Sequence, residues 1–188
     1  MAIPINIEDL LNKRKIESNR IEFKKGWNPD KIYRTICAFA NDFDNIGGGY
    51  IVVGIEEEER TGIAKRPVTG VPIEALNDIQ KDMVGYNNKI EPYYMPRIDV
   101  QEVDGKSVLV IWAPAGVNRP YNVRERVTAK QSPSKWYIRS GTSTIEAKGE
   151  VLDELREMAN RTPFDERGNE RIEISDISPA LVLSLIHI

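Results

Sequence analysis

One segment of the sequence combines the groups that bind phosphate. Arg139-Ser140-Gly141-Thr142-Ser143-Thr144 brings together a cation, four hydroxyl groups and a glycine. Guanidinium, hydroxyl and glycine-freed backbone N–H groups can all donate hydrogen bonds to phosphate oxygens. Ser and Thr also favour helix N-caps and turns for purely local reasons. The segment therefore predicts a phosphate contact, a capped turn, or both at once.

A basic stretch leads into this segment. From Arg119 to Arg139 the chain holds six Lys or Arg residues against one acidic residue, Glu125, with three aromatic residues interleaved. The net charge of the whole chain is -3, but acidic residues gather after Ile145. Because nucleic-acid binding depends on local potential, the net charge does not exclude it. The stretch fits either a nucleic-acid surface or a solvated pair of Lys/Arg-rich strands.

Apolar periodicity and turn residues indicate the elements that must position these groups. Asn28-Pro29 is a strong helix start, and Asp104-Gly105 favours a tight hairpin turn. The run from Tyr50 to Ile55 is apolar throughout, which is typical of a strand buried on both faces. We expect helices over 5–15, 29–43, 72–84 (ended by Gly85) and from about 151, and strands over 20–24, 50–55, 97–103, 107–112 and 135–139. This order predicts an α+β fold with a mixed β-sheet packed with helices, over residues 1–160.

Several other functions find no support in the residues. Gly47-Gly48-Gly49 follows a predicted helix and opens a strand without a Lys-Ser/Thr pair, so it is not a phosphate-binding loop and we expect no ATP site. A single cysteine, Cys37, and a single histidine, His187, exclude the usual zinc sites. The start of the chain lacks a secretory signal pattern, and we expect a cytoplasmic protein that does not bind membranes.

The C-terminal part of the sequence has a different composition. Residues 161–182 are rich in Pro, Gly and charge, which predicts a linker to a region that follows. Residues 183–188 match the translation of a sequencing-library adapter. We therefore expect this tail to be non-native.

Five motifs occur in an order that resembles the Schlafen-type AlbA domain family. They are Glu17 to Lys24 with its Glu-Phe-Lys end, Ala38-Phe39-Ala40-Asn41, Gly47 to Glu57, Tyr137 to Thr144, and Arg161 to Arg167. Each motif alone is weak, but the five in this order are specific. The resemblance covers the chain from about residue 8 to 167.

The resemblance implies a DNA- or RNA-binding domain of a bacterial transcriptional regulator that contacts mainly the phosphate backbone. It favours the phosphate interpretation of the hydroxyl-rich segment, and no cofactor is needed for such binding. Nucleic acid is the expected partner, with a homodimer as a further option. The expected contacts are Lys24, Lys25, Arg119, Arg124, Lys130, Lys135, Arg139, Ser140, Thr142 and Ser143.

The sequence leaves two alternative functions open. In nuclease members of the family three carboxylates hold a metal, and Glu17, Glu22 and either Glu56 or Glu57 match those positions, so Mg²⁺ or Mn²⁺ could support an endoribonuclease acting on tRNA or rRNA. The carboxylates could instead be structural, with Glu22 paired to a Lys or Arg and Glu56 in a solvated loop. The second alternative is a non-catalytic dimerisation scaffold. We expect binding without catalysis.

Overall fold

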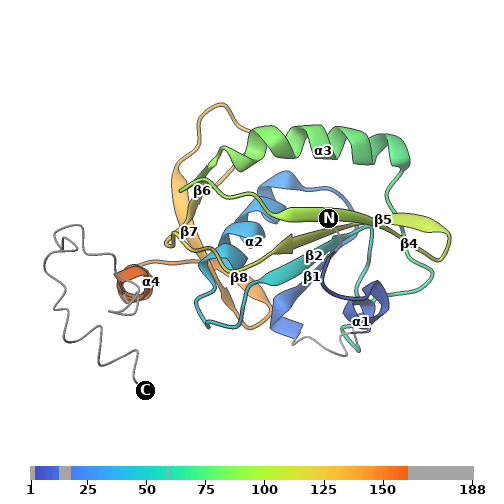
Figure 1. Ribbon diagram of the computed structural model, residues 1–188, viewed down its shortest axis with the longest axis horizontal. Coiled ribbons are helices and arrows are strands. Elements are labelled where there is room, and N and C mark those ends of the chain that lie inside the picture. Colours follow the sequence, from blue (N-terminus) through green and yellow to red (C-terminus); the bar gives the residue numbers. More distant parts are fainter. Residues whose placement is uncertain (1–2, 13–17, 59, 161–188) are drawn as a thin grey trace, which may run out of the picture.

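The computed structural model describes residues 3–12, 18–58 and 60–160, which form an α+β fold (Figure 1). The helices are α1 (Ile7–Leu11), α2 (Pro29–Asn41), α3 (Ile73–Asn87) and α4 (Glu150–Asn160), with a short 3₁₀ turn at Ser18–Arg20. The strands are β1 (Ile21–Lys24), β2 (Gly49–Val53), β3 (Ile90–Glu91), β4 (Arg97–Val103), β5 (Lys106–Ala113), β6 (Asn122–Arg124), β7 (Ser134–Ser140) and β8 (Ser143–Glu146). The expected linker at 161–182, the tail at 183–188 and Glu17 lie outside the described residues.

The strands form two four-stranded sheets rather than one. The first has the order β1-β2-β5-β4 and is mixed, because β1 and β2 are parallel while the other pairs are antiparallel. The second has the order β3-β6-β7-β8, and all its pairs are antiparallel. The hydroxyl-rich segment does not cap a helix, but it does contain a turn, at Gly141-Thr142. It forms the β7–β8 hairpin, in which Arg139 lies opposite Thr144.

The two central strands of the first sheet, β2 and β5, are largely buried on both faces, and strand alternation decides which side chains reach each face. In β2, Tyr50 and Val52 pack toward α1, whereas Ile51 and Val53 pack toward α2 and α3. β1 follows the same alternation, with Ile21 and Phe23 in the cluster on the α1 side. Glu22 and Lys24 therefore point to the other face, toward α2.

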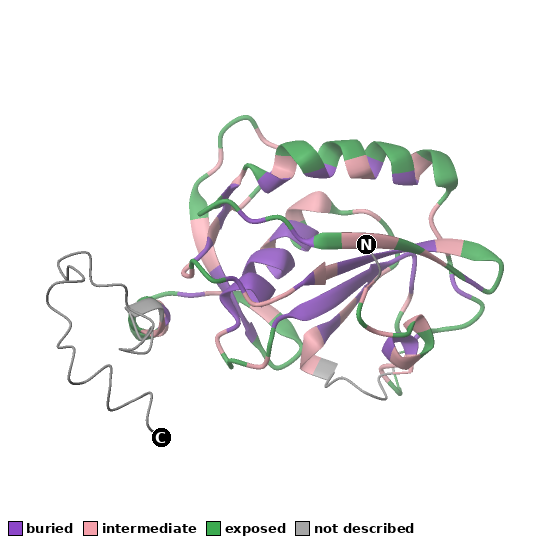
Figure 2. Cartoon of the chain, in the orientation of Figure 1, coloured by how far each residue is buried: buried purple, intermediate pink, exposed green. Residues whose placement is uncertain are grey.

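Helix α2 lies between the two sheets and is the centre of the main core (Figure 2). Asn28 caps its start by accepting a hydrogen bond from the Lys31 N–H at 3.0 Å. Its end carries Asn41, whose fully buried amide donates to the carbonyls of Tyr121 at 2.9 Å and Tyr137 at 2.8 Å and accepts from the Tyr121 N–H at 2.7 Å. Asn41 thus joins α2 to the second sheet, as a structural residue would.

The turn after α2 requires glycine for a steric reason. Asp42, with a φ of 44°, ends the helix, and its carboxylate accepts hydrogen bonds from the N–H groups of Ile46, Gly47 and Gly48. A Cβ at Gly48 would lie 2.2 Å from the Ala113 carbonyl oxygen, and its φ is +77°. Only glycine fits where this turn passes against the end of β5.

Helices α3 and α4 cover the outside of the fold. Gly85 does not end α3 as expected, and the helix continues to Asn87. The Asn87 amide oxygen accepts a hydrogen bond from the Tyr33 hydroxyl at 2.8 Å, and the Tyr86 ring packs edge-on against Tyr33. α4 packs Leu155 into a small cluster with Ile138 of β7. Among the described residues, no helix has the length and apolar character that a membrane crossing requires.

Candidate nucleic-acid interface

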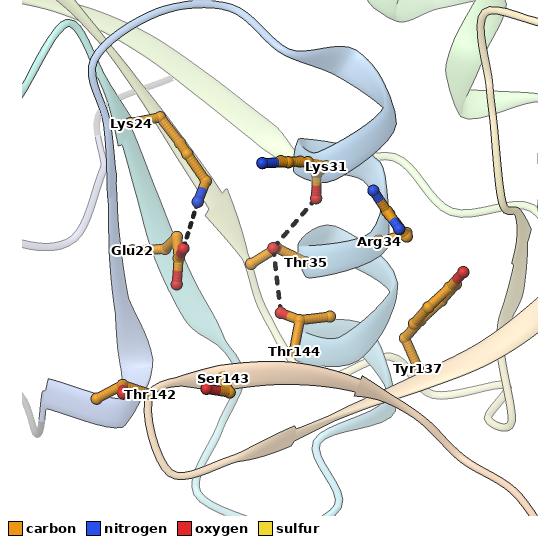
Figure 3. Close-up of a pocket in the computed structure, with 9 residues that line it drawn as sticks. All are labelled: Glu22, Lys24, Lys31, Arg34, Thr35, Tyr137, Thr142, Ser143 and Thr144. Atoms are coloured by element: carbon orange, nitrogen blue, oxygen red, sulfur yellow. Dashed lines mark hydrogen bonds and ion pairs between the residues drawn. The ribbon is translucent and has the colours of Figure 1, made fainter.

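A polar hollow of about 350 Å³ opens between β1, α2 and the β7–β8 hairpin (Figure 3). We call it the basic pocket. It is lined by Glu22, Lys24, Lys31, Arg34, Thr35, Tyr137, Thr142, Ser143 and Thr144. Three cations, four hydroxyl-bearing Ser and Thr residues and one carboxylate therefore meet in one concave site.

The first turns of α2 supply the cations that are available to a ligand. Lys31 is exposed and Arg34 is half-buried, with its Nε donating to the Asp30 carbonyl at 3.1 Å. Within the described part of the chain, neither side chain forms an ion pair with a carboxylate. Thr35 lies one turn along, and its hydroxyl contacts the Thr144 hydroxyl at 3.2 Å. Lys31, Arg34 and Thr35 share one helix face because they have i, i+3, i+4 spacing.

Arg139 is a buried structural residue rather than a surface cation. Its side chain is 7% exposed, and its guanidinium donates to the Glu22 carboxylate at 3.0 Å and to the Thr144 hydroxyl at 2.9 Å. It also donates to the carbonyls of Asn19 at 3.2 Å and Thr142 at 2.6 Å. Four of its five N–H donors therefore bond to protein acceptors, and a contact between Arg139 and phosphate stays a prediction. Arg139 holds β1 and the hairpin together around the basic pocket.

The remaining predicted contacts divide by position. Lys24, Thr142 and Ser143 line the basic pocket, while Ser140 lies in β7 beside the hairpin turn and does not line it. Of the other cations, Lys25 pairs with Glu56 at 2.8 Å and Lys135 with Glu125 at 2.7 Å.

Two arginines of the basic stretch bond to the backbone. Arg119 donates to the carbonyls of Asn41 and Asp42 at 3.3 and 3.1 Å, and Arg124 donates to the carbonyl of Lys130 at 3.2 Å. Lys130 itself is exposed. Arg119 therefore ties the loop before β6 to the end of α2, and Arg124 holds the loop between β6 and β7.

Two of the predicted carboxylates, Glu22 and Glu56, are paired with cations. Glu22 lies 2.5 Å from the Lys24 ammonium as well as 3.0 Å from Arg139. The hydrogen bond from Lys25 lowers the pKa of Glu56 below its ordinary value. Glu57 follows in the loop, where its backbone bridges to Ala64. Among residues 3–12, 18–58 and 60–160, no three Asp, Glu, His or Cys side chains are grouped so as to hold a metal ion. These residues alone do not supply the ligand set of a metal site.

Sequence reasoning missed three residues of the basic pocket, which are Lys31, Arg34 and Thr35. A signal was present, because all three lie on one side of α2, next to its apolar stripe of Ile32, Ile36 and Phe39. Polar residues that border a buried stripe at i, i+3, i+4 spacing are candidates for the wall of a pocket.

Comparisons with known proteins identify a family and a fold. The family model described as "Schlafen, AlbA_2" matches residues 17–148. The solution NMR structure of the N-terminal domain of a RecG-related protein from Nitrosomonas europaea is 26% identical, with a TM-score of 0.49, over 72% of this chain and 88% of that one. The crystal structure of the DIP2311 protein from Corynebacterium diphtheriae is 20% identical, with a TM-score of 0.50. That alignment covers 88% of this chain and 32% of the Corynebacterium protein, and at this low identity the likeness concerns the fold alone. No curated protein matches the chain.

Proposed function

The chain belongs to the Schlafen AlbA_2 family, and from this premise we propose that it binds nucleic acid through phosphate contacts in the basic pocket. One observation carries the proposal. Lys31 and Arg34 line a concave site beside the hydroxyls of Thr35, Ser143 and Thr144, and neither cation is neutralised by a carboxylate within the described residues. Such a combination offers charge and directed donors to a phosphate oxygen.

The one carboxylate in the basic pocket does not oppose anion binding. Glu22 is held by Lys24 and by the buried Arg139, so its charge is already balanced. Two further positive charges then remain to attract a phosphate. Backbone contacts of this kind are independent of base sequence and weaken as salt rises, because binding releases counterions from the nucleic acid.

We further propose that this binding serves a transcriptional regulator of the bacterial cytoplasm. The support for this finer role is the order of family motifs in the sequence. The pocket itself supports only the contact with nucleic acid.

The test measures binding of the chain to fluorescently labelled oligonucleotides by anisotropy over a series of NaCl concentrations. The double variant Lys31→Ala/Arg34→Ala should bind more weakly, and the magnitude of the slope of log K against log[salt] should fall by about 1, because one phosphate is no longer neutralised by the protein. The matched control is Lys81→Ala/Arg156→Ala, which removes a lysine and an arginine from exposed positions on α3 and α4. An unchanged slope in the first variant would exclude the basic pocket as the phosphate site.

We propose binding without strand cleavage and without a required metal or ATP. The support is that both Glu22 and Glu56 are held by cations, which a metal would have to displace. Incubation of labelled RNA with the protein, in Mn²⁺ and separately in EDTA, tests this. Mn²⁺-dependent cleavage that Glu22→Gln abolishes would overturn the proposal and establish the metal-dependent endoribonuclease instead.

A further inference from the structure

A second hollow adjoins the basic pocket. It also has a volume of about 350 Å³ and is lined by Asn28, Asp30, Lys31, Arg34, Glu125 and Arg126. Lys31 and Arg34 line both hollows. The two cations that are available to a phosphate therefore stand at the junction of two similar spaces.

Resting on the proposed function, we infer that the ligand is single-stranded nucleic acid and that two successive nucleotides fill these hollows. The phosphodiester between them lies on Lys31 and Arg34. One nucleoside occupies the basic pocket and its neighbour occupies the second hollow.

The distribution of charge favours this placement. In the second hollow Asp30 and Glu125 add two carboxylates, which would repel a phosphate but not an uncharged sugar and base. The carboxylate of Asp30 accepts hydrogen bonds from the Thr128 N–H and hydroxyl, and Glu125 pairs with Lys135, so both are fixed in place. The phosphate is thereby directed to the shared cations.

The lining of both hollows suits a nucleoside. In the basic pocket the hydroxyls of Thr35, Ser143 and Thr144 can donate and accept, and Glu22 accepts. In the second hollow the Asn28 amide nitrogen and the exposed Arg126 guanidinium can donate, and the carboxylates of Asp30 and Glu125 can accept. Sugar hydroxyls and the edges of unpaired bases are donors and acceptors that such groups can satisfy.

The concave shape discriminates against duplexes. In a double helix the bases are stacked and paired toward the axis, so nucleosides cannot enter hollows in a protein wall without being unstacked. A single strand can splay its bases outward and seat them separately. Two adjacent hollows joined by a pair of cations thus match consecutive units of a flexible strand.

The experiment uses the full chain and three kinds of probe. In NMR titrations, the dinucleoside monophosphates TpT and UpU should shift resonances of Asn28 and Arg126 together with those of Thr35 and Thr144, and their relative effects separate DNA from RNA. Inorganic phosphate should shift only signals near Lys31 and Arg34. In anisotropy measurements a 12-nucleotide single strand should bind about tenfold more tightly than its duplex.

Variants separate this inference from the proposed function. Arg126→Ala should weaken single-strand binding several-fold and weaken duplex binding less, because only the single strand enters the second hollow. If the duplex binds as tightly as the single strand, while Lys31→Ala/Arg34→Ala weakens both, the two-nucleotide inference is wrong and the proposed function stands. If neither form binds, both are wrong. Shifts from TpT and UpU that are confined to one hollow would also overturn the inference.

Discussion

Replacing Asn41 with Ala should lower the free energy of unfolding by about 3 kcal/mol. The side chain is fully buried, and its amide bonds to three backbone groups of Tyr121 and Tyr137. After the substitution the Tyr121 carbonyl keeps a partner, because the Cys37 thiol donates to it at 3.3 Å. The Tyr121 N–H and the Tyr137 carbonyl are each left without this partner. A buried polar group that loses its hydrogen-bond partner costs about 1–3 kcal/mol, and the loss costs less for a carbonyl than for an N–H.

Equilibrium unfolding in urea, followed by the fluorescence of the three tryptophans, measures this cost. The m-value should not change, because the same surface is exposed on unfolding. Asn88→Ala is the matched control. This asparagine is exposed and its side chain donates to the Val84 carbonyl, so its replacement should cost less than about 0.5 kcal/mol. A decrease below about 1 kcal/mol for Asn41→Ala would refute the reasoning that the amide holds the two backbone segments together.

Three further predictions concern the glycine turn, the cysteine and one ion pair. Gly48→Val should lower the melting temperature sharply, because its Cβ would meet the Ala113 carbonyl oxygen at 2.2 Å; a normal melt combined with an absence of nucleic-acid binding would move the turn into the site. Burial raises the pKa of the Cys37 thiol to about 12, so a thiol reagent at pH 8 should react only after denaturation, and rapid reaction of the native protein would contradict this burial. Lys25→Met should raise the pKa of Glu56 toward its ordinary value in an NMR titration, and an unchanged pKa would show that the pair does not form in solution. Because the folded-state pKa of Glu56 is lowered, any stabilisation from this pair is present above the ordinary pKa and is lost as the pH falls through the folded value.

Elements with strong local signals were predictable from the sequence. The start of α2 follows from Asn28-Pro29, whose side-chain cap the structure confirms. The Asp104-Gly105 turn is confirmed too, and both residues have the positive φ that a tight two-residue hairpin requires. The all-apolar run that became β2 is buried at every position. In each case a few adjacent residues determine the outcome.

Elements that depend on distant partners were not predictable. β3 and β6 have two and three residues, too few to show a period, and they exist because each pairs with a neighbouring strand. Gly85 indicated a helix end that tertiary contacts of Asn87 override. The basic pocket draws on β1, α2 and the hairpin, so its members are separated by more than a hundred residues. Arg139 looked like a surface cation because its burial depends on Glu22, far away in the chain.

The placement of α2 between the sheets bears on how the domain folds and unfolds. One face of α2 packs on β2 and β5, and its Asn41 is bound to backbone beyond residue 120. Separating either sheet from α2 would expose the helix, and separating the second sheet would also break the hydrogen bonds of the Asn41 amide. The two sheets therefore behave as one cooperative unit, and the slowest-exchanging amides of both should open together at the free energy of global unfolding. A fragment that stops after β5 leaves bare the face of α2 that packs on the second sheet, so a cut between the sheets would divide a single folding unit.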